Sequence, residues 1–266
     1  MQTAAPFLRW AGSKRQLVGR LASYWNGDFD RYVEPFAGSA CLFFHVAPPK
    51  ALLGDVNSEL IATYREIKYR AKEVSTQLCG FRKNKKTYYA VRKQDPSTLT
   101  DTMQAVRFIY LNRCCFNGLF RTNLLGEFNV PYGGGASGAI PSPEILKACS
   151  KKLRRASLLA ADFEATLDKV KPGDFVYMDP PFSVNAKRVF KEYSASIFNL
   201  PDVFRLRQRM ERLADERIHF LVSYLESEEA KILSKGFRVT RVSVRRNISG
   251  FIRTRSLSRE MLISYP

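Results

Sequence analysis

The sequence predicts an α/β fold, an open sheet whose strands deliver acidic side chains to one edge. Short apolar runs end in an acid three times, at Asp55, Asp162 and Asp179. Between these runs lie longer stretches in which apolar residues recur at the spacing of a helix. A hydrophobic content of 45% over 266 residues supports a substantial core. Because open α/β sheets bind ligands at the carboxyl ends of their strands, we expect the functional site at that edge.

The charge of the chain indicates a polyanionic partner. Lys and Arg total 43 against 25 Asp and Glu, a net charge of +18. Nucleic acid or an anionic membrane surface would both suit this excess. No apolar run approaches the roughly 18–20 residues of a membrane span, and the first residues lack the features of a signal peptide. We therefore expect a cytoplasmic protein that binds nucleic acid and no membrane.

The five cysteines predict reduced thiols rather than a metal site. They form no Cys-x-x-Cys pair, their number is odd, and only His45 and His219 could add imidazole ligands. We expect no metal cofactor.

Two segments near the N-terminus could hold a ligand. Residues 7–14 read Phe-Leu-Arg-Trp-Ala-Gly-Ser-Lys and precede a predicted helix from 14 to about 25. Trp10 offers a stacking face and Lys14 a point charge for a carboxylate, with a surface turn as the alternative. Residues 31–40 predict a strand, a tight loop and a helix start, in which Gly38 and Ser39 let the backbone approach a ligand closely. A plain βα turn is the alternative there.

Two further predicted strands end in acids. Residues 51–55 place Asp55 about 17 residues after Gly38, where Rossmann-like sheets commonly bind a ribose hydroxyl pair. Residues 157–163 end in Asp162 and Phe163, which could hold a purine ring and its amine. The alternative for Asp162 is the N-cap of a helix over 163–170.

Residues 56–149 predict a basic, mainly helical insert. Residues 56–155 carry 18 Lys and Arg against 7 Asp and Glu, with helical periodicity over 59–78, 86–93 and 102–112. Residues 111–123 then interleave Asn and Arg with aromatic residues, which suits reading base edges and wedging into a duplex. Asn117-Gly118 alone would also suit a hairpin turn.

The central stretch is Asp179-Pro180-Pro181-Phe182, directly after the apolar run 175–178. Two prolines cannot donate to a sheet ladder, so the strand ends abruptly and presents the acid. The Asp179 carboxylate and the Pro180 carbonyl could accept both hydrogens of an exocyclic amine, and Phe182 offers a face for a base. A surface turn is the alternative.

The C-terminal part completes the sheet. A polar, basic loop over 184–199 and a helix over 201–215 precede predicted strands at 219–224, 237–244 and 260–265. The basic loop 245–250 could contact phosphates, with a solvated charge run as the alternative.

Four motifs in one order resemble the Dam-type (D12 class) DNA adenine N6-methyltransferases over nearly the whole chain. They are Phe-x-x-Trp-x-Gly-x-Lys, Val-Glu-Pro-Phe-x-Gly-Ser, Asn-Arg-x-x-Phe-Asn-Gly-x-x-Arg-x-Asn with Gly-Glu-Phe-Asn-Val-Pro-Tyr-Gly, and Asp-Pro-Pro-Phe. The resemblance implies a Rossmann-like seven-stranded methyltransferase sheet formed by 1–55 and 150–266, with a mainly helical target-recognition insert at 56–149. It also implies S-adenosylmethionine as the methyl donor, S-adenosylhomocysteine as its product, and double-stranded DNA as the partner.

The resemblance also assigns site residues by position. The donor pocket is implied at Trp10, Lys14, Phe36, Gly38, Ser39, Asp55, Asp162 and Phe163. The catalytic residues are implied at Asp179, Pro180, Pro181 and Phe182. DNA contacts are implied at Arg9, Phe116, Asn117, Leu119, Arg121, Asn123 and Pro131.

Three departures from the family pattern matter. Ala40 replaces the usual last glycine of the donor loop, Phe182 replaces the commoner tyrosine, and the segment after residue 133 is glycine-rich. The leading hypothesis is methylation of a flipped adenine in duplex DNA. Methylation of cytosine N4, methylation of adenine in RNA and a non-catalytic DNA-binding module are the alternatives, and no obligatory protein partner is evident.

Overall fold

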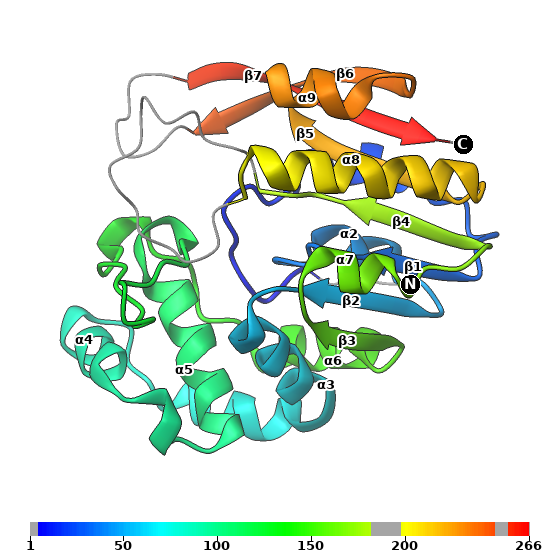
Figure 1. Ribbon diagram of the computed structural model, residues 1–266. Coiled ribbons are helices and arrows are strands. Elements are labelled where there is room, and N and C mark those ends of the chain that lie inside the picture. The colour runs from blue at the N-terminus through cyan, green and yellow to red at the C-terminus, as the bar shows by residue number, and fades with distance from the viewer. Residues whose placement is uncertain (1–4, 182–197, 248–254, 266) are drawn as a thin grey trace.

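A seven-stranded mixed sheet organises the described part of the chain, as predicted (Figure 1). The computed structural model describes residues 5–181, 198–247 and 255–265, with side chains at 245–247 and 255–258 excepted. The strand order is β3-β2-β1-β4-β5-β7-β6. The first five strands are parallel, and β7 and β6 form an antiparallel pair beside β5. The strands are β1 (Arg31–Glu34), β2 (Ala51–Asp55), β3 (Ala156–Ala160), β4 (Asp174–Met178), β5 (His219–Leu225), β6 (Arg238–Asn247) and β7 (Arg255–Tyr265).

Successive residues of the central strands point to opposite faces of the sheet, and both faces are buried. Along β4, Tyr177 packs in one hydrophobic cluster and Val176 in the other. Helices α7 (Phe163–Leu167), α8 (Leu200–Asp215) and α9 (Glu228–Ser234) cover the Val176 face. The opposite face is covered by α1 (Val18–Ala22), α2 (Cys41–Val46) and α6 (Pro143–Leu153).

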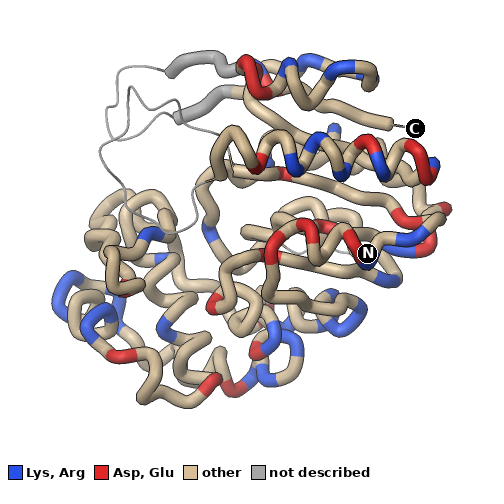
Figure 2. Tube along the Cα trace, viewed as in Figure 1, with Lys and Arg blue, Asp and Glu red and all other residues tan. Residues whose placement is uncertain are grey.

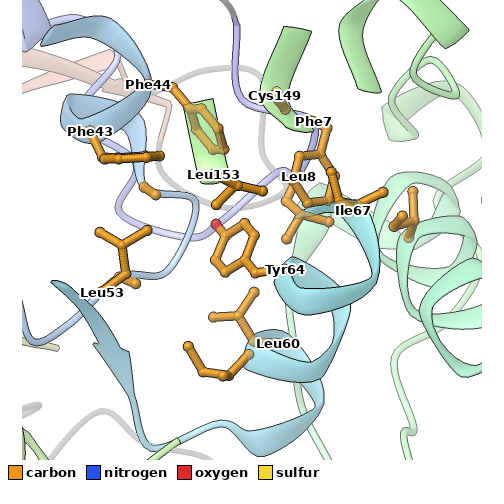
Figure 3. Close-up of a cluster of buried hydrophobic side chains, with 14 of the residues drawn as sticks. Phe7, Leu8, Phe43, Phe44, Leu53, Leu60, Tyr64, Ile67, Cys149 and Leu153 are labelled. Atoms are coloured by element: carbon orange, nitrogen blue, oxygen red, sulfur yellow. The ribbon is translucent and has the colours of Figure 1, made fainter. Parts of the chain in front are cut away.

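The insert shares the core of the sheet. Its helices are α3 (Ser58–Cys79), α4 (Lys85–Lys93) and α5 (Asp101–Cys114), with short 3₁₀ turns at Pro96–Thr98, Phe116–Gly118 and Gly134–Ala136. Figure 3 shows Tyr64 and Leu60 of α3 beside Phe7 and Leu53, within one continuous buried cluster. Figure 1 shows these helices at the carboxyl ends of the parallel strands. The insert is therefore packed directly beside the edge where the site was expected.

Charge is distributed unevenly over the described surface (Figure 2). Exposed lysines gather on and before α4, at Lys83, Lys85, Lys86 and Lys93. On α8, by contrast, arginines are interspersed with acids, and they form ion pairs with Glu164 of α7 and with Asp168 directly after it. In the described part of the chain, no helix has both the length and the apolarity that a membrane crossing requires.

Several predicted elements differ from the structure. The predicted helix 14–25 is shorter, since α1 covers only Val18–Ala22 and no side chain caps its start. Helices α6 and α9 were not predicted, although Ser142 and Ser227 cap their starts and acids fill their first turns. The predicted loop 245–250 is wrong at its start, because β6 continues to Asn247 by pairing with β7. Residues 248–250 and most of the predicted loop 184–199 lie outside the described residues.

Candidate active site

A cleft of about 1080 Å³ opens at the carboxyl edge of the sheet between β1 and β4. The chain leaves β1 toward β2 on one side and β4 toward β5 on the other, so this is the switch point of the sheet. The insert supplies the opposite wall through residues 119–122. All eight residues implied for the donor pocket line this cleft, at Trp10, Lys14, Phe36, Gly38, Ser39, Asp55, Asp162 and Phe163.

The glycine loop after β1 is held in place by Asp55. One Asp55 oxygen accepts the Gly38 N–H and the other accepts the Asn57 N–H, both at 2.9 Å. Burial raises the pKa of the Asp55 carboxyl, while these two N–H donors lower it. Gly38 has a φ of 45°, and a Cβ there would lie 2.8 Å from Cδ1 of Trp10. Glycine avoids this clash and tolerates the positive φ, which gives a physical reason for glycine at this position.

Tyr64 of α3 is a second support for the same loop, and sequence reasoning missed it. Its hydroxyl donates to the Gly38 carbonyl oxygen at 2.5 Å, and its ring is fully buried beside Phe7. The helical periodicity of α3 indicates a core residue here and gives no sign of this hydrogen bond.

The backbone conformation and burial of Ala40 show why alanine can replace the usual last glycine of this loop. Its φ of 48° and ψ of 42° lie in the left-handed region, which costs an L-residue roughly 1–2 kcal/mol. The Ala40 side chain is buried, and burial of a methyl group stabilises the folded chain by about 0.8 kcal/mol. Glycine would in addition lose about 0.5–1 kcal/mol to its freedom in the unfolded chain. The backbone cost of alanine is nearly offset by the burial of its methyl group and by the entropy that glycine would lose. Alanine is therefore tolerated here.

Ala40→Gly should therefore change the free energy of unfolding by less than about 0.5 kcal/mol. Ala47 is the matched control, because it has the same φ of 48° at the end of α2 but is only half-buried. Ala47→Gly should stabilise the chain by about 0.5–1 kcal/mol, since less buried surface is lost. Urea denaturation of both variants measures the difference, and equal effects would contradict this account.

Asp162 has the N-cap position that its alternative interpretation expects, and it is also placed at the cleft. It caps α7 by accepting the Glu164 N–H at 3.0 Å, and it also lines the cleft. Arg205 of α8 pairs with Asp162 at 2.7 Å and lies over the Phe163 ring, 4.8 Å from its centroid. Phe163 stacks on Phe36 with ring centroids 5.2 Å apart. These rings give the cleft a flat apolar wall next to an acid.

Asp179 directly follows β4 and points to the same cleft, with Pro180 and Pro181 beside it. Lys14 lies 2.8 Å from Asp179 Oδ1 and 3.6 Å from Glu260 Oε2, and it donates to the Gly12 carbonyl at 3.3 Å. Lys14 was expected to face a ligand carboxylate, and sequence reasoning did not foresee these partners. Phe182 lies outside the described residues.

Sequence reasoning also missed a buried carboxyl in the lining of the cleft. Glu34, the last residue of β1, accepts a hydrogen bond from the Tyr32 hydroxyl at 2.9 Å. Burial raises the pKa of Glu34 well above its usual range, and the Asp179 and Asp55 carboxylates raise it further. The signal was present, because an acid at the end of an apolar strand is delivered to the same edge as Asp55 and Asp179.

The implied DNA contacts are divided between the cleft and its surroundings. Leu119 and Arg121 line the cleft, and Arg121 donates to the Asn129 side chain at 2.7 Å. Arg9 donates to the Ala136 carbonyl at 2.8 Å. Asn123 organises a turn by accepting the N–H groups of residues 125 and 127. The remaining three lie on the same segment, with Asn117 and Pro131 exposed and Phe116 half-buried.

Asn117 is not at a hairpin turn. It has a φ of 54° inside the 3₁₀ turn Phe116–Gly118, and the hairpin lies further on, where Thr122 pairs with Phe128. Asn117 and Gly118 do form a turn, in which the Leu119 N–H donates to the Phe116 carbonyl, but the described hairpin pairing lies further along the chain.

The cleft is acidic although the chain is strongly basic. Its described lining contains Glu34, Asp55, Glu59, Asp162, Asp179 and Asp202 but only two cations, Lys14 and Arg121. Such a set of carboxylate acceptors suits a ligand with a positive charge or with several hydroxyl and amine hydrogens. Among the described residues, no group of His, Cys, Asp and Glu is arranged to hold a metal ion.

Comparison with known proteins gives the same family from sequence alone. The family model of the D12 class N6 adenine-specific DNA methyltransferases matches residues 10–248. A Type II methyltransferase of Lactococcus lactis subsp. cremoris, M1.LlaDCHI, is 32% identical over 97% of this chain and 94% of its own length. A DNA adenine methylase of Serratia marcescens is 31% identical over the full length of both chains. The Retron Ec67 DNA adenine methylase of Escherichia coli is 32% identical over 91% of this chain and 84% of its own length. The chain therefore belongs to the D12 class of N6 adenine-specific DNA methyltransferases, and it is a transferase that methylates adenine in DNA.

Proposed function

We propose that this enzyme transfers a methyl group from S-adenosylmethionine to N6 of an adenine flipped out of double-stranded DNA. One observation carries the proposal: the acceptor Asp179 and the Gly38–Asp55 loop line a single cleft at the switch point of the sheet. Asp179 suits the amine that is methylated, and the Gly38–Asp55 loop suits the methyl donor.

The cleft has the properties that the donor requires. When bound, S-adenosylmethionine supplies an electrophilic methyl group on a positively charged sulfur. The acids of the lining favour such a cation, and the Gly38 loop allows a close approach of backbone to ligand. We propose that Asp55 binds the ribose hydroxyls and that Phe36, Asp162 and Phe163 bind the adenine part of the donor. Trp10, Lys14 and Ser39 complete this pocket.

Asp179 and Pro180 are the residues proposed to act on the target amine. The lone pair of an exocyclic amine is delocalised into the purine ring, which makes the nitrogen a weak nucleophile. The Asp179 carboxylate and the Pro180 carbonyl can accept its two hydrogens and so orient the lone pair toward the methyl group. The negative charge of Asp179 then stabilises the positive charge that develops on the nitrogen. Pro181 keeps this backbone rigid, and Phe182 is proposed to stack on the base.

The insert is proposed to read the DNA. Its basic surface around α4 suits phosphates, and the segment 116–131 joins this surface to the cleft. Arg9, Phe116, Asn117, Leu119, Arg121, Asn123 and Pro131 are the proposed contacts. Because Leu119 and Arg121 line the cleft, we propose that they contact a base that leaves the stack.

Sequencing of DNA from cells that express the protein, with detection of modified bases, tests the proposal. The expected result is N6-methyladenine in one short sequence context, absent from cells that express Asp179→Asn. Modified cytosine at that context, or methylated RNA and unmodified DNA, would contradict it.

Arg121→Ala should reduce affinity for the methylated sequence by about 1–3 kcal/mol and affinity for random duplex by less, because Arg121 would lose contacts to a base. Lys83→Ala is the control, because its exposed side chain should contact only phosphates. It should weaken both duplexes equally and reduce the slope of affinity against salt by about one unit. Binding titrations at several salt concentrations measure both. If Arg121→Ala weakened the binding of both duplexes equally, Arg121 would have a purely electrostatic role.

A further inference from the structure

Glu260 of β7 belongs to a buried charged cluster directly behind the proposed acceptor. The Lys14 ammonium lies 2.8 Å from Asp179 Oδ1 and 3.6 Å from Glu260 Oε2. Ser223 of β5 donates its hydroxyl hydrogen to the same Glu260 oxygen at 3.0 Å. Lys14, Glu260 and Ser223 are buried, whereas the Asp179 side chain is 21% exposed and faces the cleft. Asp179 and Lys14 of this cluster line the cleft, and Glu260 and Ser223 lie buried behind them.

The sheet fixes this arrangement. Ser223 and Leu225 point to one face of β5, and Glu260 pairs with Leu225, so Glu260 and Ser223 are diagonal neighbours on that face. Tyr177 of β4 packs on the same face, and burial together with the Asp179, Glu34 and Glu260 carboxylates raises its pKa well above the usual range. Glu260 is thus a charged neighbour of the acceptor although it lies about 80 residues further along the chain.

The charges within the cluster have opposite effects on Asp179. Lys14 and Asp179 alone would form a neutral pair, and a carboxylate that is neutralised in this way stabilises a developing positive charge poorly. With Glu260, the Lys14 ammonium has a second carboxylate beside it. The attraction of the ammonium is then divided between the two carboxylates, and Asp179 keeps more of its negative charge for the cleft.

We propose that Glu260 is a positioning residue for methyl transfer, which acts by drawing the Lys14 ammonium partly away from Asp179 and by fixing its place. Removal of the Glu260 charge takes away a carboxylate that competes with Asp179 for the Lys14 ammonium. The methyl-transfer step then slows, while the binding of donor and DNA, which Glu260 does not touch, stays nearly constant. This inference rests on the proposed roles of Asp179 and the cleft.

Glu260→Gln is the variant that tests it, because glutamine keeps the size of the side chain and can still accept from Ser223. Single-turnover methylation of a duplex that carries the site identified by sequencing should be slower by about tenfold or more. The dissociation constants of S-adenosylmethionine and of the duplex should change by less than about threefold. Glu229→Gln is the matched control, because Glu229 is a buried glutamate of α9 on the other face of the sheet. It should methylate at the wild-type rate.

A double-mutant cycle with Lys14→Met separates positioning from independent effects. Glu260→Gln should reduce the rate by less than about twofold in the Lys14→Met background, since no ammonium remains to be shared. Chemical denaturation of the same four proteins should show a non-additive free energy of unfolding, which reports the Lys14–Glu260 contact without any activity.

Each other outcome overturns the proposal. A wild-type rate for Glu260→Gln, equal rate losses in both backgrounds, or a loss of donor affinity parallel to the rate would each do so. An inactive wild-type enzyme would instead refute the proposed function, and the unfolding cycle would still decide whether Glu260 and Lys14 are coupled.

Discussion

Asp179→Asn is expected to reduce the single-turnover rate of methylation by about 10²–10³-fold, the range seen when one preorganised electrostatic group is removed. Asparagine keeps the shape of the side chain but replaces one acceptor oxygen by a donor and removes the charge. The loss is enlarged because the Lys14 ammonium, 2.8 Å away, remains buried next to a neutral group. The positive nitrogen of the transition state would then meet a positive neighbour.

Donor affinity should separate this effect from damage to the cleft. Calorimetric titration with S-adenosylmethionine should give a dissociation constant within about threefold of wild type, because the loss belongs to the transition state. Asp168→Asn is the control, since Asp168 is an exposed acid that pairs only with arginines of α8 among the described residues. It should leave the rate unchanged. A methylation rate for Asp179→Asn within tenfold of wild type would contradict a catalytic role for Asp179.

Asp55→Ala is expected to weaken the binding of S-adenosylmethionine by about 1–3 kcal/mol, or roughly 5- to 150-fold. Alanine removes the proposed ribose acceptor and also removes the carboxylate oxygens that accept from the N–H groups of Gly38 and Asn57. The loop would lose the contact that holds its positive φ. Calorimetry measures the affinity directly.

Asp55→Asn should fall between alanine and wild type, because its single carbonyl oxygen can accept only one of the two backbone groups. At saturating donor, the methylation rate of both variants should recover to within a few-fold of wild type, since Asp55 is assigned to binding and not to the acceptor amine. Unchanged affinity in Asp55→Ala would contradict the assignment of the ribose to this residue. If the wild type did not bind S-adenosylmethionine, the proposal that this molecule is the methyl donor would be refuted.

The sequence by itself determined the fold class and the family, and it identified many of the residues that line the cleft. Local composition carries this information, because a strand that ends in Pro-Pro must stop and present Asp179 at the sheet edge. In the same way, Gly38 and Asp55 follow strands whose apolar runs are visible without coordinates. Parallel strands end at one edge, so acids that are far apart in the chain converge there.

Only the tertiary structure decided which side chains these residues meet. The Lys14–Asp179 pair, the Tyr64 hydrogen bond to Gly38 and the approach of Glu260 all join segments that have no local relation in the sequence. They depend on strand order and on which face each residue occupies, and a shift by one residue would reverse the face. Ala40 shows the same limit on a smaller scale. The sequence shows that alanine replaces glycine, but the burial of its methyl group, which offsets the cost of a left-handed backbone, exists only in the packed chain.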